Sequence, residues 1–193
     1  MKSIAADTLM NIIEYEKVRH TYRQDIIAYK KNRRISLGPN VMLTFENEKT
    51  LTFQIQEIMR AERLVHDAQI QEEVDVYNSI MHPESGLSAT LFIEVKEEAK
   101  IRPVLNKFIG LTTGKTLYFE VGEEKVYAVY EQGREEEDKI SSVHYIHFHF
   151  KDEQKSKLND PETEVTLVID YNDYTYSEPL PDGLRKSLYE DLS

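Results

Sequence analysis

The chain contains 193 residues, 40% of them hydrophobic, and it carries a net charge of -11 and no cysteine. This length and composition suit the core of a single domain, expected over 1–193. The absence of cysteine excludes disulfides, thiol nucleophiles and iron–sulfur clusters bound by the chain's own thiolates. The acidic balance argues against general binding to nucleic acid or anionic lipid.

The N-terminal segment lacks the apolar stretch of a signal peptide. No apolar run in the chain approaches the length of a membrane span. We therefore expect a cytoplasmic protein that does not enter a membrane.

A long helix is expected over 7–32, with Asp7 as its N-terminal cap, and Leu37-Gly38-Pro39 follows as a helix breaker. Apolar residues recur at intervals of three and four, with Arg19 in the same stripe: Ile12, Tyr15, Tyr22, Ile26 and Tyr29. Such a heptad-like stripe is typical of a helix that packs against another element. We expect packing within the chain; the alternative is a homodimer that pairs through this N-terminal helix.

Basic residues are concentrated within 17–34, a segment that we call the basic arm. It contains seven basic residues against Asp25 alone: Lys17, Arg19, Arg23, Lys30, Lys31, Arg33 and Arg34. We expect the protein's own acids to neutralise this segment, because charged side chains mostly stay in water. The alternative is an acidic partner, a phosphate group or a neighbouring subunit.

Two runs of alternating apolar residues predict a hairpin over 41–56. The first contains Val41, Leu43 and Phe45, and the second contains Leu51, Phe53 and Ile55. The pattern then becomes helical over 57–82, where one side of a second helix carries Ile70, Val74, Tyr77 and Met81. Pro83 and Gly86 are expected to end that helix.

The remainder, 87–178, reads as rich in strands, expected at 87–95, 116–121, 125–130, 141–150 and 163–170. A short helix is expected over 97–109, an acidic loop over 132–138, and a short C-terminal helix after Pro181. Hairpins with segregated helices predict an α+β fold. It would have a mostly antiparallel sheet, packed by the long N-terminal helix and several shorter ones.

The segment 110–116, Gly-Leu-Thr-Thr-Gly-Lys-Thr, is similar to a phosphate-binding loop. It is one residue too short, and a helix precedes it while a strand follows, which reverses the order that places phosphate at a helix N-terminus. We expect a helix end at Gly110 and a turn into the next strand.

Three histidines within the strand at 141–150 are candidate metal ligands: His144, His147 and His149. His147 and His149 are two residues apart, so they share one face of the strand, and such pairs form half of many Zn, Fe, Ni or Cu sites. A third ligand would be His144, from the opposite face, or would come from His20, His66, His82 or a carboxylate. The alternative is that His147 and His149 face water while His144 is hydrogen-bonded beside the core.

A second candidate site is a polar cluster on the helix after Ile55: Glu57, Arg60, Glu62, Arg63 and His66. The spacing predicts pairs along one helix face between 57 and 60, 62 and 66, and 63 and 67. Glu62 adjoins an apolar stripe that includes Val65, so a partly buried carboxylate is one expectation. The alternative is a solvated surface of weak ion pairs.

The sequence resembles an uncharacterised bacterial family of domains of unknown function. The resemblance is carried by Arg34-x-x-Leu37-Gly38-Pro39, Phe45-Glu46-Asn47, Phe53-Gln54-Ile55-Gln56-Glu57-x-Met59-Arg60-Ala61-Glu62-Arg63, and Ser142-Val143-His144-Tyr145. It implies companions among rubrerythrin-like and iron–sulfur oxidoreductase proteins, and it implies no active site.

These observations favour a non-catalytic accessory or interaction protein, serving a redox or iron-handling system, with no cofactor of its own. No G-x-S-x-G motif indicates a nucleophile, and the basic arm lacks a nucleic-acid reading motif. The first alternative is a metal-binding protein or metalloenzyme that uses the strand histidines with a divalent transition metal. The second is a phosphate-ligand binder that uses Arg60, Arg63 and the basic arm.

Overall fold

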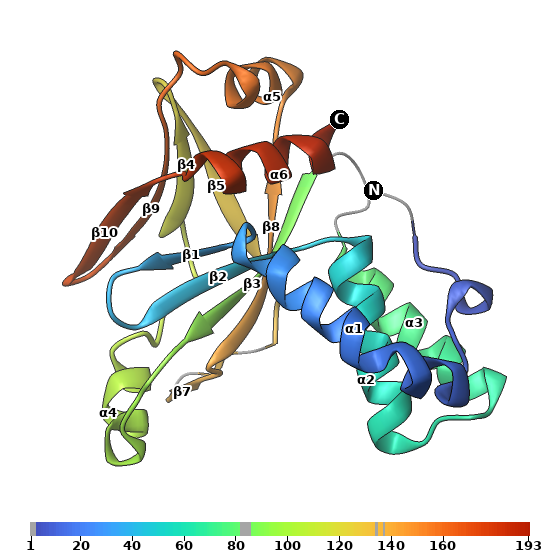
Figure 1. The fold of residues 1–193 in the computed structure, drawn as a ribbon. Coiled ribbons are helices and arrows are strands. Elements are labelled where there is room, and N and C mark those ends of the chain that lie inside the picture. Colours follow the sequence, from blue (N-terminus) through green and yellow to red (C-terminus); the bar gives the residue numbers. More distant parts are fainter. Residues whose placement is uncertain (1–2, 82–85, 134, 137) are drawn as a thin grey trace.

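The computed structural model describes residues 3–81, 86–133, 135–136 and 138–193, and it confirms the α+β class (Figure 1). Its main sheet has eight strands in the order β1-β2-β3-β8-β5-β4-β9-β10. All neighbouring strands in this sheet are antiparallel. None of the helices in the described ranges is long and apolar enough to span a bilayer.

The strands of the main sheet are β1 (Arg34–Leu37), β2 (Val41–Glu46), β3 (Gly86–Ile93), β4 (Leu117–Val121), β5 (Glu124–Tyr130), β8 (Val143–His149), β9 (Val165–Tyr171) and β10 (Tyr174–Pro179). A separate two-stranded ribbon contains β6 (Glu135–Glu136) and β7 (Lys139–Ile140). The helical elements are η1 (Ala6–Thr8), α1 (Ile12–Lys31), α2 (Glu48–Glu62), α3 (Asp67–Ile80), η2 (Glu98–Lys100), α4 (Ile101–Asn106), α5 (Asp152–Asn159) and α6 (Asp182–Leu192).

The sheet is so strongly curved that its edge strands β1 and β10 contact each other. The hydroxyl of Tyr174 on β10 donates to the carbonyl of Leu37 at 2.5 Å and accepts from the backbone N–H groups of Asn40 and Val41. Gly38 in the same turn has a φ of +69°, and a Cβ there would lie 2.6 Å from the ring of Tyr176. The closing contact therefore depends on a glycine.

The main core lies inside this curved sheet, and α4, α5 and α6 contribute to covering it. Phe45, Phe119 and Phe148 meet at its centre, with the last two ring centroids 4.7 Å apart. Alternate residues point inward along strands such as β5 and β8, which explains the period-two patterns in the sequence.

Helices α1, α2 and α3 gather on one side of the sheet, and the last two enclose a second, smaller core (Figure 1). Leu51, Ile55 and Met59 of α2 pack there with Val74 of α3. Along α1, Tyr15 and Ile26 are fully buried, and Tyr15 and Tyr22 make edge-on ring contacts that continue to Phe53 of α2. The stripe on the N-terminal helix therefore packs within the chain, as expected, against α2.

The second half of the expected hairpin at 41–56 is wrong, because residues 48–62 form helix α2. The side chains of Asn47 and Thr50 form a reciprocal capping box that starts a helix there. Leu51, Ile55 and Met59 are four apart and all buried, so the helical period decides the structure. Strand β2 pairs instead with β1 and β3.

Two helix boundaries and several strands also differ from the expectation. Helix α1 starts at Ile12, and Asn11 rather than Asp7 caps it by accepting from the N–H of Glu14. The expected helical segment 57–82 contains two helices, as the sequence indicated, but the first ends earlier, at Glu62, because Arg63 has a left-handed φ of 56°. The sequence patterns did not predict β1, β6, β7 or β10, and β6 lies within the segment expected to be an acidic loop.

The remaining strands and the C-terminal helix are confirmed with small shifts at their ends, and η2 and α4 occupy the first part of the expected helix over 97–109. The expected terminator Pro83 and the candidate ligand His82 lie outside the described residues, as do Arg134 and Glu137 of the expected acidic loop.

Candidate functional site

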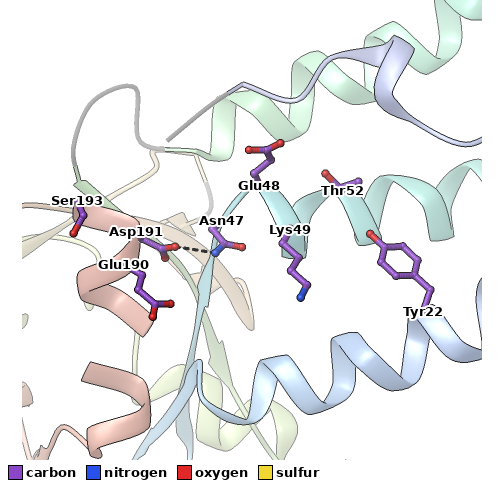
Figure 2. Close-up of a pocket in the computed structure, with 8 residues that line it drawn as sticks. All are labelled: Tyr22, Asn47, Glu48, Lys49, Thr52, Glu190, Asp191 and Ser193. Carbon is purple, nitrogen blue, oxygen red and sulfur yellow. Dashed lines mark hydrogen bonds between the residues drawn. The ribbon is translucent and has the colours of Figure 1, made fainter. Parts of the chain in front are cut away.

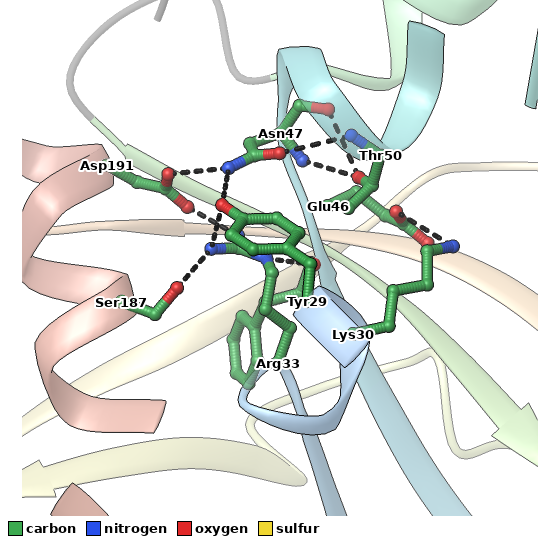
Figure 3. A network of polar contacts seen from close by, with 9 residues as sticks. Tyr29, Lys30, Arg33, Glu46, Asn47, Thr50, Ser187 and Asp191 are labelled. Carbon is green, nitrogen blue, oxygen red and sulfur yellow. Dashed lines mark hydrogen bonds and ion pairs between the residues drawn. The ribbon is translucent and has the colours of Figure 1, made fainter. Parts of the chain in front are cut away.

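A buried arginine connects three parts of the fold that are distant in sequence. Arg33 lies between α1 and β1 and is fully buried. Its Nε donates to the carbonyl of Phe45 at 2.8 Å, its Nη1 donates to Ser187 at 2.8 Å, and its Nη2 pairs with Asp191 (Figure 3). Helix α6 is thereby fixed to the end of α1 and to β2.

Asn47 extends this network to the start of α2. Its Nδ2 donates to the hydroxyl of Tyr29 and to Oδ1 of Asp191, both at 2.8 Å (Figure 3). The same side chain caps α2 by accepting from the N–H of Thr50. We call Tyr29, Arg33, Asn47, Ser187 and Asp191 the Arg33 network. Because its groups already bind one another, its chemistry is that of a structural junction.

A polar pocket of about 540 Å³ adjoins the network (Figure 2). It is lined by Tyr22, Asn47, Glu48, Lys49, Thr52, Glu190, Asp191 and Ser193. Asn47 and Asp191, its two most buried side chains, are engaged in the network. The charged groups that stay free in it, such as Glu48 and Glu190, are exposed, so the pocket lacks the desolvated acid or base of a catalytic site.

A second buried charge lies on the outer face of β2. Glu46 is 2% exposed; its carboxylate accepts from Thr90 at 3.4 Å and lies 3.7 Å from the Nζ of Lys30. Burial lowers the pKa of the Lys30 ammonium, and the nearby carboxylate opposes that shift in part. The pair therefore joins α1 to the sheet through a contact too long for a direct hydrogen bond.

The polar cluster expected on the helix after Ile55 is divided by the structure. Glu57 receives two hydrogen bonds from Arg19 of α1, both at 2.8 Å, and one from Tyr15 at 2.6 Å. The Arg19 hydrogen bonds hold the pKa of Glu57 below its ordinary value, and burial raises the pKa of the Tyr15 hydroxyl. Arg60 pairs with Glu16, also of α1.

The three expected pairs along the helix are therefore wrong. Glu57 and Arg60 bind residues of α1 instead of each other. Because α2 ends at Glu62, residues 63, 66 and 67 do not continue its face. Glu62 and His66 are exposed, as is Val65, so the buried carboxylate expected at Glu62 is wrong too.

The basic arm has a mixed outcome. Arg19, Lys30 and Arg33 each pair with an acid of the same chain, as expected. The other members are exposed and have no ion pair to a described residue: Lys17, Arg23, Lys31 and Arg34.

An open groove of about 880 Å³ lies where the start of α1 meets the end of α2. We call it the tip groove. It is lined by Ile12, Ile13, Glu16, Lys17, Arg60, Ala61, Arg63 and Val65. Ile13 is 73% exposed and Val65 is 65% exposed. Large apolar side chains that remain in water next to a groove are typical of a contact surface.

The strand histidines lie on β8, and His144 faces away from the other two. His144 is fully buried on the core side, with Nε2 2.8 Å from the carbonyl of Ser141 and its ring near Tyr130. His147 and His149 lie on the opposite face. No group of three His, Cys, Asp or Glu side chains among the described residues is arranged to hold a metal ion. The metal site stays a prediction.

The segment 110–116 forms turns between α4 and β4, as expected. Gly110 has a left-handed φ of +95°, and the hydroxyl of Thr116 donates to the carbonyl of Leu111 at 2.7 Å. Helix α4 precedes the segment instead of following it, so the arrangement that binds phosphate is not formed.

Sequence reasoning missed the Arg33 network. In the sequence, Arg33 is only one charge of the basic arm, and no pattern marks Asp191. The one available signal was Phe45-Glu46-Asn47, because a polar pair directly after an apolar strand residue marks a strand end and a helix cap. The partners on α6 had no signal of their own.

Fold and site together define an α+β protein with a curved antiparallel sheet, a side bundle of three helices and a buried arginine junction. The model of the family described as "Protein of unknown function (DUF3501)" matches residues 3–192. The chain belongs to this family.

The chain is similar to the solved structure of a protein of Burkholderia pseudomallei K96243, described as a novel protein of unknown function. The two are 30% identical, each is covered completely, and the TM-score is 0.90. No curated protein matches the chain. The comparisons thus establish family and fold and assign no activity.

Proposed function

We propose that this protein is a non-catalytic accessory protein of the cytoplasm that acts by binding another protein. The tip groove carries the proposal. Ile13 and Val65 are mostly exposed there, although their burial would be favourable by roughly 1.5–3 kcal/mol each. A partner that covers them would recover that free energy. The groove also lies where the basic arm, through Lys17, meets residues 57–67.

A redox or iron-handling setting rests on the family resemblance alone. Since the chain has no cysteine, it would assist a protein that carries an iron–sulfur cluster.

The test is capture of a partner from native cells with tagged protein. Ile13→Asp with Val65→Asp places two charges in the tip groove without disturbing the core. Val129→Asp is the matched control, because Val129 is 62% exposed on β5, outside the groove. We expect a stoichiometric partner with wild type and control that the double variant does not retain. If wild type recovers no stoichiometric partner, or the double variant recovers as much, the proposal is wrong.

A metal-binding function is the second candidate, since His147 and His149 share one face of β8. Elemental analysis of protein purified without a histidine tag tests it. A content below about 0.1 metal per chain would exclude a tight structural or catalytic site, because such sites are normally filled. The phosphate-binding candidate has less support, because Arg60 is already engaged by Glu16.

A further inference from the structure

The tip groove is lined by apolar side chains together with charged side chains, which we call its rim. We propose that its occupant is an acidic amphipathic helix of a partner protein. This inference rests on the proposed function and specifies the chemistry of the partner.

The charge of the rim is opposite in sign to that of the whole chain. Glu16 and Arg60 neutralise each other in a pair at 2.6 Å. Lys17 and Arg63 also line the groove and have no ion pair to any residue in the described ranges. Three of the four charged residues that line the groove are basic, so its lining carries a net charge of +2 on a chain of net charge -11.

The apolar part of the groove suits the side of a helix. Ile12 and Ile13 come from α1, whereas Ala61 and Val65 come from α2 and the loop after it. Apolar groups on two converging elements form a trough, the shape into which an amphipathic helix places residues spaced by three and four. The groove is open, so it lacks the enclosure of a small-molecule site.

Charge also argues against two other occupants of the groove, a second copy of the chain and an anionic membrane. In a symmetric pair of copies, the same patch faces itself, so Lys17 and Arg63 would approach their own counterparts. An anionic membrane would meet only these two unpaired cations of the groove, whereas polybasic membrane sites use about 4–8, and the chain's net charge is repelled by such a surface. An acidic helix is attracted by Lys17 and Arg63, and it is small enough to stay away from the acidic remainder of the chain.

Two fluorescent peptides test the proposal. Both carry leucine at helical spacing on one face; their other positions are glutamate and alanine in the first peptide and lysine and alanine in the second. Anisotropy should show that the glutamate peptide binds at least about tenfold more tightly, the effect of a few exposed charge pairs. Its affinity should fall as salt is raised. Lys17→Glu with Arg63→Glu should reverse the preference, Ile13→Asp should abolish binding, and Val129→Asp should change nothing.

The inference is overturned if neither peptide binds, or if both bind equally and the charge-reversed variant leaves this unchanged. It is also overturned if sedimentation shows a dimer that Ile13→Asp dissociates, or if the protein binds vesicles of anionic lipid through Ile13. Failure of the proposed function is a different result: wild type then captures no partner from cells. A partner captured through the groove by a basic segment would retain the function and refute the acidic helix.

Discussion

Removing the carboxylate of Asp191 is the most direct test of the Arg33 network. The fully buried guanidinium of Arg33 has Asp191 as its counter-ion, and the Asp191 side chain is only 9% exposed. In Asp191→Ala, the charge of Arg33 stays in the interior without its anion, and the amide of Asn47 loses one of its two acceptors.

The expected cost follows from this burial. Removing one partner of a buried ion pair typically destabilises a protein by about 3–5 kcal/mol, since the other charge remains desolvated. For a chain of 193 residues, each kcal/mol shifts the melting temperature by roughly 2–4 °C, so a fall of about 6–20 °C is expected.

Urea denaturation followed by circular dichroism measures the effect. Glu190→Ala, on the exposed side of α6, is the matched control and should stay within about 0.5 kcal/mol of wild type. Combining Arg33→Ala with Asp191→Ala should cost about 0.5–3 kcal/mol less than the two single changes added together, because the groups interact directly. A loss below about 1 kcal/mol in Asp191→Ala would refute the assignment of the network as a structural junction.

Three further changes probe other parts of the fold. Glu57→Gln should destabilise the protein relative to wild type by its full amount above pH 4.5, and this difference should vanish as the pH falls through the lowered pKa of Glu57. The reason is that only the ionised carboxylate attracts Arg19. A difference in stability that does not depend on pH in urea titrations would contradict this. Tyr174→Phe removes the hydroxyl that joins β10 to the β1–β2 turn and should cost about 1–3 kcal/mol by thermal melting, whereas an unchanged melt would show that the edge contact is not needed. Gly38→Ala should destabilise the protein by at least roughly 1 kcal/mol, the cost of a non-glycine residue in the left-handed region, and its Cβ would also meet the ring of Tyr176. The melting temperature should therefore fall; one equal to or above that of wild type would refute the close approach.

Local patterns in the sequence were sufficient for much of the fold. The stripe from Ile12 to Tyr29 identified a packed helix, and alternating residues identified β2, β3, β4, β5, β8 and β9. At 48–62 two periods competed: Leu51, Phe53 and Ile55 alternate, while Leu51, Ile55 and Met59 are four apart. The capping side chains of Asn47 and Thr50 favoured the helix, and alternation over a few residues did not outweigh them.

Candidate sites were predicted less well, because charged side chains choose partners in space. Glu57 and Arg60 had suitable neighbours on their own helix, yet both bind α1, at sequence separations of 38 and 44 residues. Arg33 and Asp191 are 158 positions apart, and no local pattern connects them.

The sequence by itself determined the class of fold, the inward faces of most strands and helices, and the family, because these depend on the order of polar and apolar residues along short segments. Only the tertiary structure decided which charges are buried and which stay free. Folding placed Arg33 beneath α6, where it needs Asp191, and left Lys17 and Arg63 at the rim of the tip groove without acids of their own. The physical reason is that desolvation and charge pairing depend on distances between elements that the chain brings together only when it folds.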